Sequence, residues 1–338
     1  MGMTLKVKKE EEKICSMLRE LLSDAVKRNT ADALLLSGGL DTSILAAASE
    51  DTGRNKLALT VFMKETPASD PEYAKTVAQK FFYEHHLISI TENEALEKIP
   101  EVIRAVENFD PALPNDLVIY VALKEAKKLG IESVMTGDGA DELFAGYSYM
   151  HELLHKELNG YIRILSNSKT MYFSSNKLGD YLGVEIKQPY LDTEFVDFAL
   201  DINPGLKVKE IEGRKYGKWI LRKAFEKELG EVAWREKEPI EFGSGATKLR
   251  ESIRRKISDA EFKDKKREYE MEFMNKEHLF FYEVYKEVVG EIPKATGKAK
   301  ANVCPLCKAE LPENRFHCNI CGFCYPIGRY IGDTNTDE

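Results

Sequence analysis

The chain lacks the segments that direct a protein into or across a membrane. It has no apolar run of membrane-spanning length and no cleavable leader, and its first residues, MGMTLK, lack the serine or threonine of a myristoylation site. These absences predict a cytoplasmic protein with no membrane partner. The net charge of −8 also argues against nucleic-acid binding over the whole surface, although a local basic patch would not show in that sum.

Cysteine is missing from most of the chain. One of the six cysteines is Cys15, and the other five lie within residues 304–324, so they do not form a disulfide framework spread over the fold. Two Cys-x-x-Cys pairs separated by ten residues lie in this segment, which has too few apolar residues for a core. Such spacing indicates a small zinc ribbon that Zn²⁺ would fold. The predicted ligands are Cys304, Cys307, Cys318 and Cys321, with Cys324 in reserve and His317 as a weaker candidate.

Strand-like and helical segments alternate along the rest of the chain. An amphipathic helix is expected over residues 6–29, and short β-like runs then alternate with helical runs. The strands are expected at 33–37, 56–63, 86–91 and 133–136, and the helices between them at 71–82 and 117–130. This order predicts an α/β fold with a doubly wound parallel sheet.

The stretch SGGLDTS, residues 37–43, is the candidate ligand-binding turn. It joins a strand that ends at Leu36 to a helix expected from about Ser43, and Gly38 and Gly39 allow positive φ and close approach of a ligand to the backbone. Free amides and the helix dipole favour a phosphate. No Gly-Lys-Ser/Thr follows, so this is not a Walker A loop; instead Asp41 would hold Mg²⁺ that neutralises pyrophosphate. The structural alternative is a tight turn with a helix cap.

Five blocks of sequence resemble one enzyme family. SGGLDTS resembles the pyrophosphate-binding loop (PP-loop) of enzymes that split ATP into AMP and pyrophosphate, and four further blocks occur in the order seen in the synthetase domain of asparagine synthetases. These blocks are 134–147, 176–200, 217–229 and 233–245. The resemblance covers about residues 31–245 and implies an adenine nucleotide alpha hydrolase-like fold. It also implies an ATP-dependent carbon–nitrogen ligase in which the aspartate carboxylate attacks the α-phosphate, giving β-aspartyl-AMP, and ammonia then displaces AMP.

The resemblance also implies roles for individual residues. Asp141 would join Asp41 in holding Mg²⁺, Lys218 and Lys237 would supply cations, and Asp138 stands where these enzymes usually carry a glutamate that organises amidation. The expected contacts to ATP and pyrophosphate are Leu36, Ser37, Gly38, Gly39, Asp41, Thr42, Ser43, Val61, Met63 and Gly137, with adenine read by the backbone of Val61 and Met63. The structural alternatives are helix N-terminal acids for Asp138 and Asp141, and apolar core for the residues expected near adenine. Arg222 and Lys223 are interpreted as surface residues, Arg222 being partly covered.

The acceptor segment departs from the family pattern. Residues 107–120, ENFDPALPNDLVIY, occupy the stretch that lines the acceptor pocket in asparagine synthetases, but the hydroxyl-rich run after the aspartate is missing. The residues from Pro111 to Pro114 offer no side-chain donors, so aspartate is expected as the substrate by analogy only. Glu185 and Asp192 either bind an amino group or pair with nearby lysines.

Four segments are expected along the chain: an N-terminal helix (1–29), the PP-loop synthetase-like domain (30–250), a helical appendage with a basic linker (251–297) and the zinc ribbon (298–330). Only about 30 residues precede the loop, too few for the amidotransferase domain of glutamine-using asparagine synthetases. Ammonia is therefore expected to arrive free or from a separate glutaminase subunit. Cys15 is interpreted as a small buried group rather than a nucleophile. Whether the chain forms a homo-oligomer is left open.

Two other functions compete with amide ligation. PP-loop enzymes that adenylate a tRNA base before sulfur transfer often carry zinc modules, but this chain has no cysteine between residues 30 and 303 and is acidic. The ribbon is where nucleic acid would bind in that case. A third hypothesis is a weakened scaffold whose ribbon recruits a partner, and it depends on Asp138 and the altered acceptor segment.

Overall fold

The computed structural model describes residues 2–50, 56–166, 171–269, 271–293, 302–311 and 317–324. The chain forms two compact units, which we describe separately. The first unit comprises Met1–Val61, Ser69–Ile88 and Ala122–Pro239, and the second comprises Phe62–Ala68, Ser89–Val121 and Ile240–Glu338. The four segments expected from the sequence stay a prediction, and most of the basic linker, at 294–301, lies outside the described residues.

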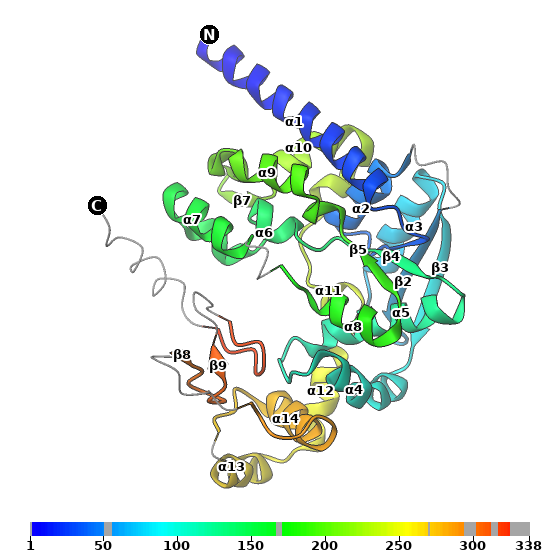
Figure 1. Cartoon of the computed structure of the whole chain (residues 1–338), viewed down its shortest axis with the longest axis vertical. Coiled ribbons are helices and arrows are strands. Elements are labelled where there is room, and N and C mark those ends of the chain that lie inside the picture. The colour runs from blue at the N-terminus through cyan, green and yellow to red at the C-terminus, as the bar shows by residue number, and fades with distance from the viewer. Residues whose placement is uncertain are drawn as a thin grey trace. The chain divides into compact units, whose positions relative to one another are not determined.

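A five-stranded sheet forms the centre of the first unit (Figure 1). Its order is β3-β2-β1-β4-β5, and the strands are β1 (Ala33–Leu35), β2 (Leu57–Met63), β3 (Glu84–Ile90), β4 (Ser133–Met135) and β5 (Glu185–Lys187). β1 pairs in parallel with both β2 and β4, and β4 pairs in parallel with β5. The predicted doubly wound α/β fold is therefore confirmed. The chain leaves β1 for β2 on one side and returns to β4 on the other, so the strand order reverses between β1 and β4, where ligands of such sheets bind.

Helices cover the sheet of the first unit. They are α1 (Gly2–Arg28), α2 (Leu40–Ala48), α3 (Asp70–Lys80), α6 (Ala140–Phe144), α7 (His155–Leu165), α8 (Ser174–Leu182), α9 (Thr193–Asp201) and α10 (Trp219–Leu229). Between them lie short 3-10 turns at η2 (Ser148–Glu152), η3 (Pro189–Leu191), η4 (Pro204–Leu206) and η5 (Gly230–Trp234), and the hairpin β6 (Val208–Ile211) and β7 (Arg214–Gly217). α1 packs against α2, α9 and α10, as Figure 1 shows. Its apolar stripe, with Leu18, Leu22 and Val26, joins Leu34 and Leu36 of the sheet in one core.

The second unit is mainly helical. It contains α4 (Glu92–Val106), the start of α5 (Leu113–Lys128), α11 (Ile240–Gly243), α12 (Lys248–Lys256), α13 (Asp259–Glu268), α14 (Lys276–Val288) and the short strands β8 (Asn302–Val303) and β9 (Glu310–Leu311). α4, α12 and α14 pack against one another. α13 buries none of its residues, in keeping with its charged sequence.

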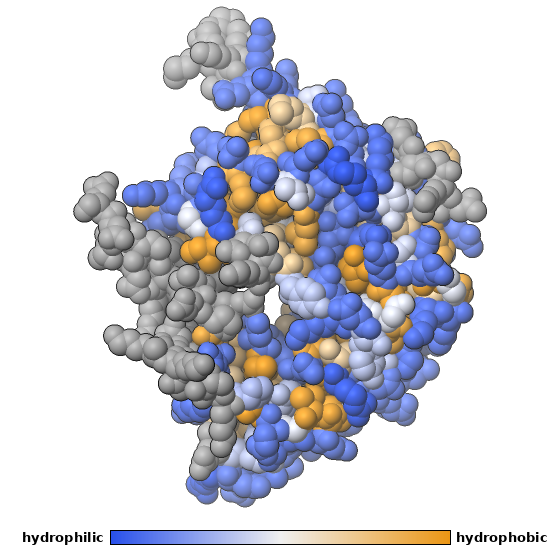
Figure 2. Space-filling model, viewed as in Figure 1, coloured by the Kyte–Doolittle hydropathy of each residue, from blue (hydrophilic) through white to orange (hydrophobic). Residues whose placement is uncertain are grey.

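Polar residues predominate on the described part of the face in Figure 2, and hydrophobic residues form separate patches on it. None of the helices among the described residues combines the length and the apolar character needed to cross a bilayer.

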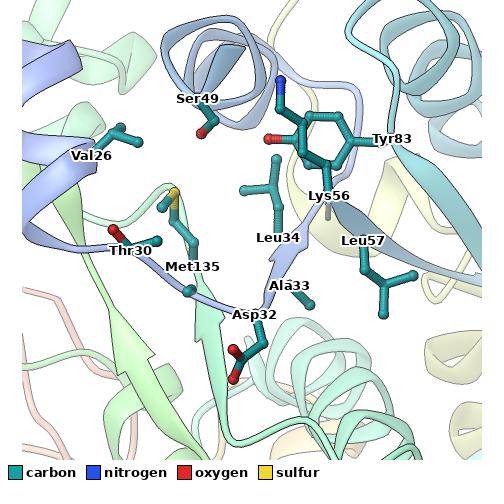
Figure 3. Close-up of a pocket in the computed structure, with 11 residues that line it drawn as sticks. Val26, Thr30, Asp32, Ala33, Leu34, Ser49, Lys56, Leu57, Tyr83 and Met135 are labelled. Atoms are coloured by element: carbon teal, nitrogen blue, oxygen red, sulfur yellow. The ribbon is translucent and has the colours of Figure 1, made fainter. Parts of the chain in front are cut away.

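A small cavity lies at the amino ends of the strands (Figure 3). Its lining includes Asp32 and Ala33 at the start of β1, Lys56 and Leu57 at the start of β2, and Tyr83. The cavity has a volume of about 30 Å³, which is room for a water molecule or two. It is too small for a nucleotide and lies at the opposite edge of the sheet from the SGGLDTS loop.

Lys207 is an unusual buried cation of the first unit. Lys207 lies between η4 and β6 along the chain, and its side chain is fully buried. Its Nζ lies 5.7 Å from the centre of the Phe144 ring and has no hydrogen-bond partner among the described residues. Burial, followed by the charge of Arg163, lowers the pKa of Lys207 to about 7. The unfolded chain therefore binds more protons than the folded chain between about pH 7 and pH 10, so this lysine makes stability rise with pH in that window.

Lys207→Met is expected to raise the free energy of unfolding by about 1 kcal/mol or more near pH 6, because it removes an unpaired buried charge. The gain should shrink as the pH is raised towards 10. Denaturant unfolding at several pH values tests this, with Lys209→Met, whose side chain is 43% exposed, as the control. An equal effect of the two substitutions at every pH would contradict the assignment.

Candidate functional site

The SGGLDTS loop runs from the carboxyl end of β1 into α2. Gly39 is the N-cap of α2, and no side chain caps this helix within the described residues, so its first N–H groups are available to a ligand. Ser37 and Thr42 shape the loop internally: the Gly39 N–H donates to Ser37 Oγ at 3.2 Å, and the Ser37 N–H donates to Thr42 Oγ1 at 3.3 Å. The helix begins at Leu40, three residues before the start expected at Ser43.

The two glycines of the loop differ in backbone conformation and in the space around them. Gly38 has φ +68°, as the sequence allowed, and a Cβ there would lie within 2.6 Å of the Tyr73 carbonyl carbon, so α3 leaves no room for a side chain at this position. Contact of the Gly38 backbone with a ligand stays a prediction. Gly39 has φ −70°, and the nearest atom to a Cβ there would be Ser37 Oγ at 3.2 Å. Apart from Ser37 Oγ, no atom of the described residues lies within 4 Å of that Cβ position, leaving out the neighbouring residues in the chain.

Asp41 and Asp141 converge on one lysine. Asp41 lies in the first turn of α2, after β1, and Asp141 lies in the first turn of α6, after the neighbouring strand β4. Lys218 Nζ lies 2.7 and 2.6 Å from the two carboxylate oxygens of Asp41 and 2.6 Å from Asp141 Oδ1. Lys237 also pairs with Asp141 Oδ1. The loops touch at Gly137, where a Cβ would lie 3.0 Å from the Asp41 Cβ.

The charges of this cluster depend on one another. Burial raises the pKa of Asp141, but the ammonium groups of Lys218 and Lys237 outweigh burial and hold that pKa well below its usual range. Burial lowers the pKa of Lys218, and the charges of Asp141 and Asp41 outweigh it and raise that pKa. Asp141 is therefore anionic and Lys218 is cationic near neutral pH. Converging carboxylates are the donor set that suits Mg²⁺, and both side chains keep 22% exposure.

Two backbone features fit Lys218 into this cluster, and neither was expected from the sequence. Lys218 has φ +56°, a left-handed conformation at the N-cap of α10, and its N–H donates to the Phe144 carbonyl at 2.9 Å. A Cβ at Gly146 would overlap Asp141 Oδ1 and the Lys218 side chain. Gly146 is therefore required by the ion pair itself.

Glu142 and Tyr147 lie beside the same cluster. Burial, followed by the charge of Asp141, raises the pKa of Glu142 to about 7, and Tyr147 donates its hydroxyl to Glu142 Oε1 at 2.5 Å. Lys237 lies 4.7 Å from the centre of the Tyr147 ring and is 35% exposed, whereas Lys218 is almost fully buried. Lys237 is thus the more accessible of the two predicted cations.

Asp138 is held by side chains instead of capping a helix. Its Oδ2 accepts hydrogen bonds from Thr136 Oγ1 at 2.6 Å, Ser175 Oγ at 2.6 Å and Gln188 Nε2 at 3.0 Å. The N-cap of α6 is Gly139, and within the described part of the chain no side chain caps that helix. Three donors on one oxygen fix the orientation of this carboxylate, which favours a positioned functional group over the interpretation as a helix N-terminal acid.

Arg235 and Tyr190 support the loop and were not singled out in the sequence, and a third residue, Arg222, was misread. Arg235 donates to the Ser37 carbonyl at 3.2 Å and to Asp70 at 2.8 Å, and Tyr190 donates its hydroxyl to the Asp41 carbonyl at 3.0 Å. Arg222 is not a surface residue: it is buried and donates to the backbone carbonyls of residues 217, 233 and 235. A buried guanidinium with backbone partners leaves no periodic signal in the sequence.

Four residues expected near ATP are buried in the structure. Leu36, Ser43, Val61 and Met63 are each 5% exposed or less, and the Ser43 hydroxyl has no hydrogen-bond partner among the described residues. The Met63 N–H donates to the Ser244 carbonyl at 2.8 Å, so this amide is not free to read adenine. Their roles at the nucleotide stay predictions, and apolar core describes their present surroundings.

Two carboxylates whose roles the sequence left open form ion pairs in the structure. Asp192 forms a bidentate pair with Arg28 at 2.8 and 2.7 Å, and Glu185 pairs with Lys187 at 2.6 Å. Both carboxylates therefore have cationic partners. Burial also raises the pKa of Cys15 to about 11, which fits a structural thiol.

In the second unit, four cysteines form a closed cluster. The buried thiols of Cys304, Cys307, Cys318 and Cys321 lie within 4.8 Å of one another, with sulfur–sulfur distances of 3.5 Å for Cys304–Cys321 and 3.6 Å for Cys307–Cys318. A disulfide needs about 2.05 Å, whereas four thiolates around a tetrahedral Zn²⁺ lie about 3.8 Å apart. Cys324 is exposed and stands outside the cluster. The donor set fits Zn²⁺, and it consists of the four predicted residues.

Comparison with known proteins gives consistent matches. The profile of the family described as asparagine synthase matches residues 17–178 and 160–306. A Dictyostelium discoideum protein described as probable asparagine synthetase [glutamine-hydrolyzing] is 32% identical over 292 residues, which are 76% of this chain and 52% of that protein. Asparagine synthetase B [glutamine-hydrolyzing] of Escherichia coli K12 is 31% identical over 304 residues, 82% of this chain and 54% of that protein.

The chain thus spans about half the length of these curated relatives. Among solved structures, NMN synthetase from Francisella tularensis aligns over 56% of this chain and 76% of its own, with 20% identity and a TM-score of 0.29.

Proposed function

The chain belongs to the asparagine synthase family, and from this premise we propose that it is an ATP-dependent amide ligase that activates a carboxylate by adenylation. The observation that carries the proposal is the convergence of Asp41, Asp141 and Lys218 where the strand order of the parallel sheet reverses. Uncapped amides at the start of α2 lie on the same loop as Asp41. Such a site suits the polyphosphate of a nucleotide.

In the proposed reaction, a carboxylate oxygen of the acceptor attacks the α-phosphorus of ATP. The bond from that phosphorus to the α–β bridging oxygen breaks, and pyrophosphate leaves with the electron pair. Ammonia then attacks the acyl carbon and loses a proton, and AMP leaves with the former acceptor oxygen. With aspartate as the acceptor, the intermediate is β-aspartyl-AMP and the product is asparagine. Mg²⁺, held by Asp41 and Asp141, would neutralise charge on the pyrophosphate.

The protein residues would have separate tasks. The α2 amides and Lys237 would bind phosphate oxygens, Lys218 would keep the two aspartates together before the nucleotide enters, and Asp138 would orient the amidation step. Asp138 is one methylene shorter than the glutamate expected from the resemblance, and its three donors fix where its carboxylate lies. The cysteine cluster would hold Zn²⁺.

Pyrophosphate release in the presence of ATP and Mg²⁺ tests the proposal. We expect stimulation by aspartate plus ammonium, with asparagine and AMP formed in equal amounts. Parallel reactions with glutamine in place of ammonium show whether the chain needs a separate supply of ammonia. Stimulation by tRNA instead of a carboxylate would point to a base-adenylating enzyme, and no stimulation by any acceptor would point to a scaffold.

A further inference from the structure

The turn at Phe109–Asp110 lies in the segment that the proposed function assigns to the acceptor carboxylate. It connects α4, which ends at Val106, to α5, which begins at Leu113. The turn is organised locally by two hydrogen bonds: the Asp110 N–H donates to Asn108 Oδ1 at 3.1 Å, and Asp110 Oδ1 accepts from the Ala112 N–H at 2.8 Å. These bonds leave the other oxygen of Asp110 for a partner outside the turn.

The cysteine module supplies that partner and one more. Asp110 Oδ2 lies 2.9 Å from His317 Nε2, and the Phe109 N–H donates to the Ile320 carbonyl at 2.8 Å. His317 directly precedes Cys318, and Ile320 directly precedes Cys321. Both contacts therefore come from the second Cys-x-x-Cys knuckle, whose backbone path is set by two cluster cysteines.

Gly322 shows how closely the knuckle approaches the turn. It has φ +74°, and a Cβ there would lie 2.5 Å from both Cγ and Oδ1 of Asp110 and 2.7 Å from Oδ2. A side chain at this position would push the module away from the turn. The absence of a side chain at Gly322 is thus what lets the knuckle lie this close to the turn.

The opposite side of the turn is fixed by α14. The Phe109 ring is fully buried, stacks on His278 with 5.3 Å between ring centres, and meets the rings of Tyr282 at 5.2 Å and Tyr285 at 5.1 Å. Phe109 is therefore held by a helix through its side chain and by the knuckle through its backbone.

We propose that the cysteine module is a metal-dependent clamp that positions the Phe109–Asp110 turn. A Cys₄ knuckle has little core of its own, so its conformation depends on the bound metal. Without zinc, the Ile320 carbonyl and His317 lose their fixed positions, and the turn keeps only its local hydrogen bonds and the packing of Phe109. The role in acceptor binding rests on the proposed function; the clamp itself does not.

Paired serine substitutions test the clamp. Cys321→Ser removes a cluster thiol, and Cys324→Ser removes an exposed thiol three residues away that lies outside the cluster. Zinc content is measured by elemental analysis, and backbone hydrogen exchange is followed in peptides covering residues 107–113. We expect Cys321→Ser to lose zinc and to speed exchange at the Phe109 amide at least tenfold, while residues 34–48 stay protected. Cys324→Ser should match the unmodified protein.

Loss of zinc with unchanged protection at Phe109 overturns the clamp, as does an equal effect of the two serine variants. Exchange needs no turnover, so this result stands whether or not a carboxylate acceptor is found.

A second pair of variants separates docking from metal binding. Gly322→Ala should keep zinc but lose protection at Phe109 and raise the KM of the acceptor at least fivefold, with the KM of ATP changed less than twofold. Gly290→Ala is the matched control, because Gly290 also has positive φ but a Cβ there would meet no atom of the described residues within 4 Å. Unchanged exchange and acceptor KM in Gly322→Ala would contradict a positioning role. If no acceptor supports turnover, the proposed function fails while the exchange data still decide the clamp.

Discussion

Asp41→Asn is expected to lower the rate of pyrophosphate release by roughly 100-fold or more while leaving the fold intact. The substitution removes the negative charge that would hold Mg²⁺ beside the loop. The fold should survive because Lys218 keeps Asp141 as its partner at 2.6 Å, and Tyr190 still donates to the backbone carbonyl of residue 41. Initial rates at saturating ATP, together with thermal unfolding, measure both effects.

Asp201→Asn is the control for this experiment. Asp201 is also an aspartate of the first unit, but its side chain is 84% exposed and lies 3.7 Å from Arg163. Its replacement should change neither rate nor stability noticeably. Undiminished turnover in Asp41→Asn would contradict the assignment of Asp41 to the metal.

Lys218→Met is expected to have the largest effect on stability. Lys218 is 4% exposed and balances two carboxylates, and removing one partner of a buried ion pair typically costs about 3 kcal/mol or more. Activity should fall as well, because Asp41 and Asp141 would repel each other when the lysine is gone. Chemical denaturation gives the free energy, and Lys215→Met, which breaks only the exposed pair with Glu152, is the control.

The pH dependence gives this prediction a sign. The depressed pKa of Asp141 stabilises the protein above the unfolded pKa, near 4, and this contribution is lost as the pH falls through the folded pKa. The raised pKa of Lys218 stabilises below about pH 10 and is lost as the pH rises through its folded pKa. In Lys218→Met the two carboxylates repel each other, which favours their protonation. The deficit in the free energy of unfolding, relative to the unmodified protein, should therefore shrink as the pH falls towards about 4. A deficit independent of pH would mean that packing, not charge, explains the loss.

The fold and the centre of the site follow from short-range signals in the sequence. Alternating apolar runs predicted the parallel sheet, because its central strands are largely buried and the connections between parallel strands form helices. Asp41 and Asp141 each follow a strand by a few residues, and the carboxyl ends of adjacent parallel strands necessarily meet. The cysteine spacing likewise limits which four thiols can surround one metal.

Long-range packing accounts for what the sequence did not reveal. No sequence motif marks Gly146 as necessary. A glycine is needed there only because Asp141 and Lys218 occupy the space where a side chain would be. Arg222 resembles any helical arginine until its backbone partners fold around it. The contact between His317 and Asp110 joins residues 207 positions apart, and no local sequence pattern can predict a contact at that separation.

The central claim is that nucleotide bound at the SGGLDTS loop is cleaved between its α- and β-phosphates. Phosphorus NMR of a complete reaction, containing the purified chain, ATP, Mg²⁺, aspartate and ammonium, tests it most directly. The account predicts resonances of AMP and pyrophosphate in equal amounts. The appearance of ADP and orthophosphate as the primary products would contradict it.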